Sequence, residues 1–104
     1  MNRKFYGLLG LCRRAGKLAM GQTLCENAIR SGEGTLVILA ADASENTQKK
    51  FYNSSQYYKL PLVKAADREE LGTALGRAEL AVAVVTDPGF AQRLLALAED
   101  TGMN

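Results

Sequence analysis

Two short segments are apolar at nearly every position, and they constrain the fold more than any other feature. Residues 35–41 (TLVILAA) and 80–86 (LAVAVVT) are continuous runs rich in β-branched side chains. Such runs are typical of strands buried on both faces of a sheet, because each face packs against a covering layer. The sequence therefore predicts a sheet enclosed between two layers of helices.

Helical patterns lie before, between and after these two strands. In the first pattern, Phe5, Leu8, Leu9 and Cys12 follow the spacing of one helix face. Further helices are expected at residues 21–31, 42–60, 67–76 and 87–98, and weaker strands at residues 17–20, at a sheet edge, and 60–65. This alternation predicts an α/β fold, a three-layer α/β/α sandwich around a mixed sheet of about four strands.

Length and composition indicate one globular domain, and the lack of a membrane span and of a signal peptide favours the cytoplasm. The 104 residues are 47% hydrophobic and 23% charged, values typical of a single folded domain. The longest apolar run, residues 36–41, is far shorter than the roughly 20 residues of a membrane helix. The basic start resembles a signal peptide, but Gly7, Gly10 and the pair Arg13-Arg14 leave no apolar segment after it.

The residue types that most enzymes need are scarce. The chain has no histidine, which removes the commonest metal ligand and general base. No glycine-rich loop follows a strand at the spacing used to hold phosphates. Cys12 and Cys25 lie on expected core faces, where a free cysteine acts as a small hydrophobic residue. We therefore expect no catalytic residue, metal or cofactor.

Acids at the expected helix starts leave one alternative open. Asp42 follows a buried strand, where α/β folds often place their sites, so it could bind Mg²⁺ or accept a phosphoryl group. Either Asp42 or Ser44 could instead cap the next helix, as we expect Asp67 and Asp87 to do further along. The capping interpretation is favoured at each of these positions.

Charge is distributed unevenly along the chain. The first 30 residues carry six cations against the single acid Glu26, whereas from residue 65 onward seven acids face three arginines. A basic third in a small domain indicates a face directed at a polyanion. A solvated surface of mixed charge is the other interpretation. The six cations are Arg3, Lys4, Arg13, Arg14, Lys17 and Arg30.

The start of the second expected helix, Gly21-Gln22-Thr23, is a candidate anion site. Free backbone N–H groups and the positive end of the helix dipole attract anions there. Because Arg13, Arg14 and Lys17 precede it closely in sequence, a nucleic-acid phosphate is the expected ligand.

Glycines in the first helix suggest a second surface. Arg3, Gly7 and Gly10 share a stripe opposite the apolar face, and each glycine costs about 1 kcal/mol of helix stability relative to alanine. Close approach of another backbone, from protein or RNA, could offset that cost. Loose terminal structure is the alternative.

Three tyrosines lie close to lysines in the middle of the chain. Tyr52, Tyr57 and Tyr58 are near the lysines at positions 49, 50 and 59, so they could form a platform on which bases stack. We favour the interpretation that some of them cover the sheet.

Four segments resemble one protein family over nearly the whole chain. They are LLGLCRRAGKLAMG (residues 8–21), AIRSGEGTLVILAADASENTQKKF (28–51), ELGTALG (70–76) and AVAVVTDPGFA (81–91). They resemble the L-seven-Ae/L-thirty-e family of small ribosomal proteins, the binders of kink-turn RNA, and within it the bacterial YlxQ-like branch. The resemblance implies a single RNA-binding domain over residues 1–104, with an α/β/α fold and no catalysis.

The resemblance also implies a binding mode. In the family's kink-turn binders, the second helix enters a widened groove at tandem G·A pairs, where an Asn–Glu pair and a Lys contact the RNA. These positions correspond to Thr23, Leu24 and Asn27 here. A loop before the last strand, which would cover a flipped-out nucleotide, corresponds to residues 76–80 with Arg77 and Ala78.

Two of these positions depart from the family pattern. Leu24 cannot accept a hydrogen bond from a guanine, and Asn27 has no charge to meet a phosphate. A good bidentate base contact contributes about 1–3 kcal/mol, so RNA binding is favoured over strict kink-turn binding. The expected contacts are Gly21, Gln22, Thr23, Leu24 and Asn27, with Arg13, Arg14, Lys17 and Arg30 as electrostatic support and Arg77 and Ala78 in the covering loop.

The expected partner is structured RNA, ribosomal RNA first, in a ribosomal or translation-accessory role. Proteins of the ribosome or translation factors are secondary candidate partners. The alternative function is a protein-interaction module of translation or ribosome assembly that has lost kink-turn specificity and docks through the Arg3, Gly7, Gly10 stripe.

Overall fold

The protein's structure, a computed structural model, describes residues 3–100. A four-stranded mixed sheet lies at its centre, with the strand order β1-β4-β2-β3. β2 and β3 run parallel, and β4 runs antiparallel to both of its neighbours, β1 and β2. The strands are β1 (Leu18–Met20), β2 (Leu36–Ala40), β3 (Leu62–Ala65) and β4 (Val82–Val85).

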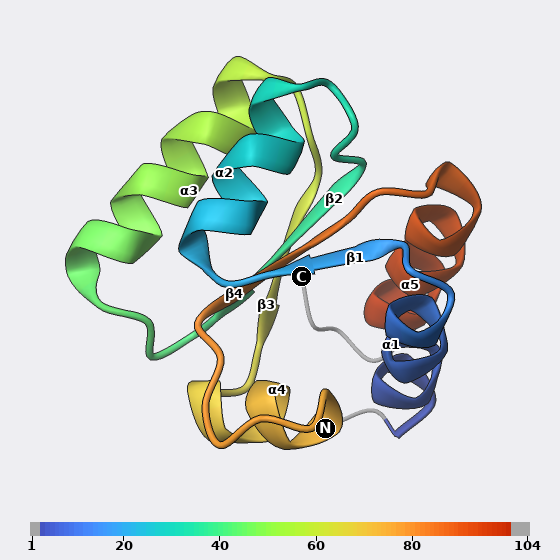
Figure 1. The fold of residues 1–104 in the computed structure, drawn as a ribbon. Helices are drawn as coiled ribbons and strands as arrows, with labels where there is room; N and C mark the ends of the chain where they lie inside the picture. The colour runs from blue at the N-terminus through green and yellow to red at the C-terminus, as the bar shows by residue number, and fades with distance from the viewer. Residues whose placement is uncertain (1–2, 101–104) are drawn as a thin grey trace.

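Helices cover both faces of this sheet, which confirms the expected three layers. Helices α2 and α3 lie on one face, and α1 and α5 lie on the other, with α4 next to α1 (Figure 1). The two central strands, β2 and β4, are buried at every position because both their faces are covered. The helices are α1 (Arg3–Arg14), α2 (Gln22–Arg30), α3 (Glu45–Tyr57), α4 (Arg68–Ala74) and α5 (Pro88–Asp100).

Caps at the helix starts follow the expectations with one exception. The carboxylate of Asp67 accepts from the Glu70 N–H at 2.7 Å, and that of Asp87 accepts from the Phe90 N–H at 2.9 Å. At α3 the cap is Ser44, whose hydroxyl accepts from the Thr47 N–H at 3.2 Å.

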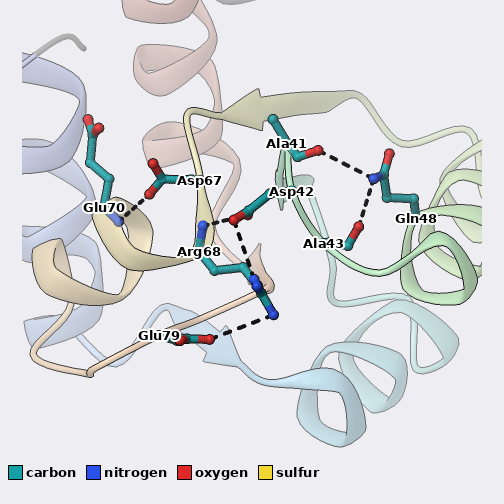
Figure 2. Close-up of polar contacts among 8 residues, drawn as sticks. All are labelled: Ala41, Asp42, Ala43, Gln48, Asp67, Arg68, Glu70 and Glu79. Atoms are coloured by element: carbon teal, nitrogen blue, oxygen red, sulfur yellow. Dashed lines mark hydrogen bonds and ion pairs between the residues drawn. The ribbon is translucent and has the colours of Figure 1, made fainter.

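Asp42 does not cap α3. Its Oδ1 accepts from the Arg68 N–H at 2.7 Å, so it satisfies the first turn of α4 instead (Figure 2). The turn between β2 and α3 is held by Gln48, whose amide donates to the carbonyls of Ala41 and Ala43. This hydrogen bonding places Asp42 toward α4 rather than toward the helix that follows it in sequence.

The expected core positions of the cysteines are confirmed. Both thiols are fully buried, and burial raises the pKa of Cys12 to about 11 and that of Cys25 to about 12. The Cys25 thiol donates to the Ala19 carbonyl at 3.4 Å. Neither group has the exposure or the lowered pKa of a reactive cysteine.

The expectation that tyrosines of residues 52–58 cover the sheet is wrong. Tyr52, Tyr57 and Tyr58 are all exposed, at 51%, 80% and 39%. The buried face of α3 is formed instead by Thr47, Phe51 and Ser55. Ser55 is accommodated because its hydroxyl donates to the Tyr52 carbonyl at 2.8 Å.

The two glycines of α1 lie in different surroundings. A Cβ placed on Gly10 would lie 4.0 Å from the Ala74 carbonyl of α4, whereas one on Gly7 would meet nothing within 4 Å. Gly10 therefore faces a neighbouring backbone within this chain, and Gly7 faces open space. Within residues 3–100, no helix combines the length and the apolar character needed to span a bilayer.

Candidate nucleic-acid interface

Helix α2 begins at a backbone conformation that requires glycine. Gly21 has φ 89° and ψ 160°, a region that side chains with a Cβ essentially never occupy. Its N–H donates to the Val82 carbonyl at 3.2 Å, which fixes the start of α2 to the beginning of β4. A Cβ built on Gly21 meets nothing within 4 Å, so the space above it is open.

The first turn of α2 keeps its backbone donors free. Glycine offers no side-chain cap, and the turn contains no acid. The helical hydrogen bonds begin with the Cys25 N–H, which donates to the Gly21 carbonyl at 3.0 Å. Within residues 3–100, the N–H groups of Gln22, Thr23 and Leu24 find no acceptor. The expected anion site is therefore open to solvent, with the helix dipole directed at it.

Side chains on the inner side of α2 tie it to α3. The Gln22 amide donates to the Thr47 hydroxyl at 3.1 Å, so this expected RNA contact is engaged within the protein. Glu26 pairs with Lys50 at 2.5 Å, and the hydrogen bond from that ammonium lowers the pKa of the Glu26 carboxyl. These contacts hold the start of α2 at a fixed angle.

The outer side of α2 faces a groove along the edge strand β1. Leu24 and Asn27 line it from the helix, and Leu18 and Ala19 from the strand. The groove has a volume of about 460 Å³, and the Leu24 side chain is 57% exposed. Gly16, in the basic turn that connects α1 to β1, also lines the groove, and so does the acid Glu33 after the end of α2. The structure thus brings Leu24 and Asn27 together on one surface beside that turn.

Among the described residues, none of the four supporting cations lines this groove, and Lys17 and Arg30 lie away from the helix start. The Lys17 carbonyl accepts from the Thr86 N–H at the end of β1 opposite Gly21, about 13 Å away at 3.3 Å per residue. Arg30 is in the last turn of α2, about 12 Å from its start. Within the described part of the chain, none of Arg13, Arg14, Lys17 and Arg30 forms an ion pair.

The loop between α4 and β4 ends next to the start of α2, because the Gly21 N–H donates to the Val82 carbonyl at the beginning of β4 (Figure 1). It is packed tightly on α4, since a Cβ on Gly72 would lie only 2.7 Å from the Glu79 backbone. The Arg77 N–H donates to the Gly72 carbonyl at 2.8 Å. Arg77 and Ala78 remain exposed at the tip, and a Cβ on Gly76 would lie 3.5 Å from the Arg13 guanidinium.

Comparison with known proteins identifies the chain's relatives. The profile of the ribosomal protein L7Ae/L30e/S12e/Gadd45 family matches residues 3–95. The chain belongs to this family. It is 42% identical over 94 residues to the RNA-binding protein YlxQ of Bacillus subtilis (strain 168), covering 90% of this chain and 94% of the relative.

Two further comparisons agree with this membership in the L7Ae/L30e/S12e/Gadd45 family. The RNA-binding protein YlxQ of Enterococcus faecium is 37% identical over 97 residues, which cover 93% of each chain. A solved structure, described as a protein with unknown function from Bacillus halodurans C, superposes with a TM-score of 0.88 at 38% identity. It covers 92% of this chain and 97% of that one.

In this family member, an ion network beside the loop was missed by sequence reasoning. Arg68 lies between Asp42, at 3.5 Å from its Nε, and Glu79, at 3.7 Å from its Nη1 (Figure 2). Asp42 and Arg68 are 26 positions apart, so no local pattern signals the pair. Both Asp42 oxygens are engaged by Arg68, and residues 3–100 contain no metal-type cluster of three or more His, Cys, Asp or Glu side chains.

Proposed function

We propose that this protein binds structured RNA and does not catalyse a reaction on it. The contact surface consists of the first turn of α2, the groove between α2 and β1, and the tip of the loop at Arg77 and Ala78. Family membership and two relatives described as RNA-binding proteins support this proposal. The observation that carries it is the row of three unpaired N–H groups at Gln22, Thr23 and Leu24.

An RNA phosphate fits this row of donors better than a small free anion does. The site is an open surface and not an enclosed pocket, so a ligand held there needs further contacts to bind well. The groove extends the surface along α2, and Arg14 and Lys17 flank Gly16, which lines the groove from the turn between α1 and β1. A polyanion with regularly spaced phosphates engages the helix start and these cations together.

The side chains of this surface favour recognition of RNA shape over base reading. Leu24 offers an apolar contact and Asn27 an uncharged amide, so neither gives the charged hydrogen bonds that read a guanine edge strongly. Backbone donors and cations position a distorted RNA without reading its sequence. The proposed RNA is therefore kink-turn-like or ribosomal, bound in the cytoplasm by an accessory of translation.

A matched pair of RNAs tests this proposal. One is a kink-turn hairpin, and in the other the tandem G·A pairs are replaced by Watson–Crick pairs. We expect both to bind at low salt, with the kink-turn bound more tightly because its widened groove admits α2. Equal dissociation constants would reject kink-turn specificity and leave general RNA binding. Absence of binding to either RNA would reject the function itself.

Protein docking through the Arg3, Gly7 and Gly10 stripe is the alternative function, with Gly7 as its open part because Gly10 faces α4 within this chain. The open face at Gly7 favours it, since Gly7 lines a groove between α1 and α5 with Leu11, which is 49% exposed. Salt separates the two functions. Binding of RNA through several phosphates weakens steeply as ionic strength rises, whereas docking on this largely apolar groove has a shallow salt dependence.

A further inference from the structure

A second groove lies at the opposite edge of the sheet from β1, between α3 and β3. Its floor includes Leu39 of β2, and one wall is formed by Tyr52 on the outer face of α3. Lys49 and Lys64 stand at its rim, on the helix and on the edge strand. The groove has a volume of about 450 Å³, which is in the range of ligand-binding clefts.

The chemistry of this groove is aromatic and cationic. Tyr52 is half exposed, and within residues 3–100 neither Lys49 nor Lys64 forms an ion pair. Between positions 46 and 66 the chain has four lysines and three of its four tyrosines, and no acid. Glu45, at the start of α3, is the one acid that lines the groove.

Of the common ligands, a nucleotide strand matches this combination most closely. Every base has a flat face that stacks on an aromatic ring, and its phosphate pairs with lysine. An acidic peptide would use the lysines but would leave the Tyr52 ring without a stacking partner. A half-exposed ring beside two unpaired ammonium groups therefore favours an unpaired base.

The two grooves are connected by the packing of α2 on α3. The Gln22–Thr47 hydrogen bond places the first turn of α3 beside the start of α2. Glu45 and Gln48, in the same turn of α3 as Thr47, already line the second groove. Three interstrand spacings, about 14 Å, separate the two edges of the sheet. One RNA can therefore extend from the start of α2 to Tyr52.

We propose that the groove between α3 and β3 binds an unpaired nucleotide of a single-stranded RNA segment, with the base stacked on Tyr52 and the backbone phosphates on Lys49 and Lys64. This site extends the proposed function, because the single strand flanks the structured element held by α2. It makes the protein a reader of structured RNA together with its adjoining unpaired strand.

The test uses a kink-turn hairpin with blunt ends and the same hairpin with ten uridines added at each end. We expect the extensions to tighten binding about fivefold or more, the size of one base–aromatic stack. Tyr52→Ala should abolish this gain and leave the affinity for the blunt hairpin unchanged. Tyr57→Ala is the matched control, because it also removes a tyrosine ring, but one that is 80% exposed and lies outside the groove.

Extensions of abasic nucleotides separate stacking from charge. They carry the same phosphates, so an equal gain from them would overturn the base-stacking site. A gain that survives Tyr52→Ala, or no gain in the wild-type protein, would overturn it as well. Because the chain has no tryptophan, quenching of tyrosine emission by decauridine alone gives a second measurement, which Tyr52→Ala should weaken.

These measurements also separate this site from the proposed function. If the blunt hairpin fails to bind, the proposed function fails. Quenching of tyrosine emission by decauridine then tests the groove between α3 and β3 by itself. Quenching that depends on Tyr52 would support the groove, and no quenching would overturn it. If the hairpin binds and the extensions add nothing, the groove proposal alone fails.

Discussion

The start of α2 differs from the starts of α3, α4 and α5. Those three helices are capped from within the protein by Ser44, Asp67 and Asp87, and α4 receives a second carboxylate from Asp42. Helix α2 starts at Gly21 with no side-chain acceptor. Among helices α2 to α5, the starts of α3, α4 and α5 have their donors satisfied within the protein, whereas the start of α2 does not.

The open start of α2 is not a defect of the fold. Replacing a Ser or Asp cap with glycine costs only a few tenths of a kcal/mol, and the start is held by the Gly21–Val82 and Gln22–Thr47 hydrogen bonds. A well-positioned, uncapped helix start is what an anion site requires. The comparison thus predicts that changes at α2 act on RNA binding and changes at the capped starts act on stability.

The largest expected effect comes from reversing two cations next to the α2 groove. Arg14→Glu with Lys17→Glu should weaken RNA binding at least tenfold at low salt, because two phosphate contacts become repulsive. The slope of log K against log[salt] should become shallower by about 1.5 units. A titration of labelled RNA at several salt concentrations measures both quantities.

The control for this variant is a charge reversal elsewhere. Arg93→Glu reverses one exposed cation of α5. It is compared with the single variant Lys17→Glu, which changes the net charge by the same amount. We expect Lys17→Glu to lower the affinity more than Arg93→Glu does. Equal losses would mean that only net charge matters and that the binding surface is not at the basic turn.

The fold was largely predictable from the sequence because its signals are local. Two apolar runs give β2 and β4, and helical periodicity gives the buried face of α1. The cap of α3 was ambiguous between Asp42 and Ser44, since either carries an acceptor. The choice depends on Arg68, which only the tertiary fold brings to Asp42.

The candidate site was less predictable because it depends on distances in space. Lys17 and Arg30 are close in sequence to Gly21, yet a strand and a helix carry them about 10 Å or more away. The tyrosines were misjudged because aromatic rings are usually buried. Here the face of α3 that packs on the sheet is filled by Phe51, Thr47 and Ser55. Tyr52 therefore lies on the exposed side of the helix.

An acid added to the open helix start should have opposite effects on stability and on RNA binding. Thr23→Asp places a negative charge in the first turn of α2, so it should stabilise the folded protein by about 0.5 kcal/mol through the helix dipole. The same charge repels phosphate, and we expect RNA affinity to fall about fivefold. Denaturant unfolding and an RNA titration on one preparation measure the two opposite effects.

The reciprocal change is made at a capped start. Asp87→Ala removes the acceptor for the Phe90 N–H and should cost about 1 kcal/mol of stability, with RNA affinity unchanged. If Thr23→Asp left RNA affinity intact, or if Asp87→Ala lowered it as much, the distinction between the open and capped starts would have no functional meaning.

The smallest expected effect concerns the ion pair that holds α2 against α3. The Lys50 ammonium lowers the pKa of Glu26 in the folded protein, below the value of about 4.3 for a free glutamate. The pair therefore contributes stability that is fully present above that value and is lost as the pH falls through the folded pKa. Lys50→Met should lower stability slightly at pH 7, and the difference from wild type should shrink as the pH falls through the folded pKa of Glu26.

RNA binding by Lys50→Met tests whether the inner side of α2 takes part in binding. Lys50 is already neutralised by Glu26, so its removal should change the affinity for RNA at pH 7 by less than twofold. Unfolding measured from pH 3 to 7, with RNA titrations at pH 7, tests both parts. A large loss of affinity would show that Lys50 leaves Glu26 to meet a phosphate, and the inner side of α2 would then belong to the binding surface together with its open start.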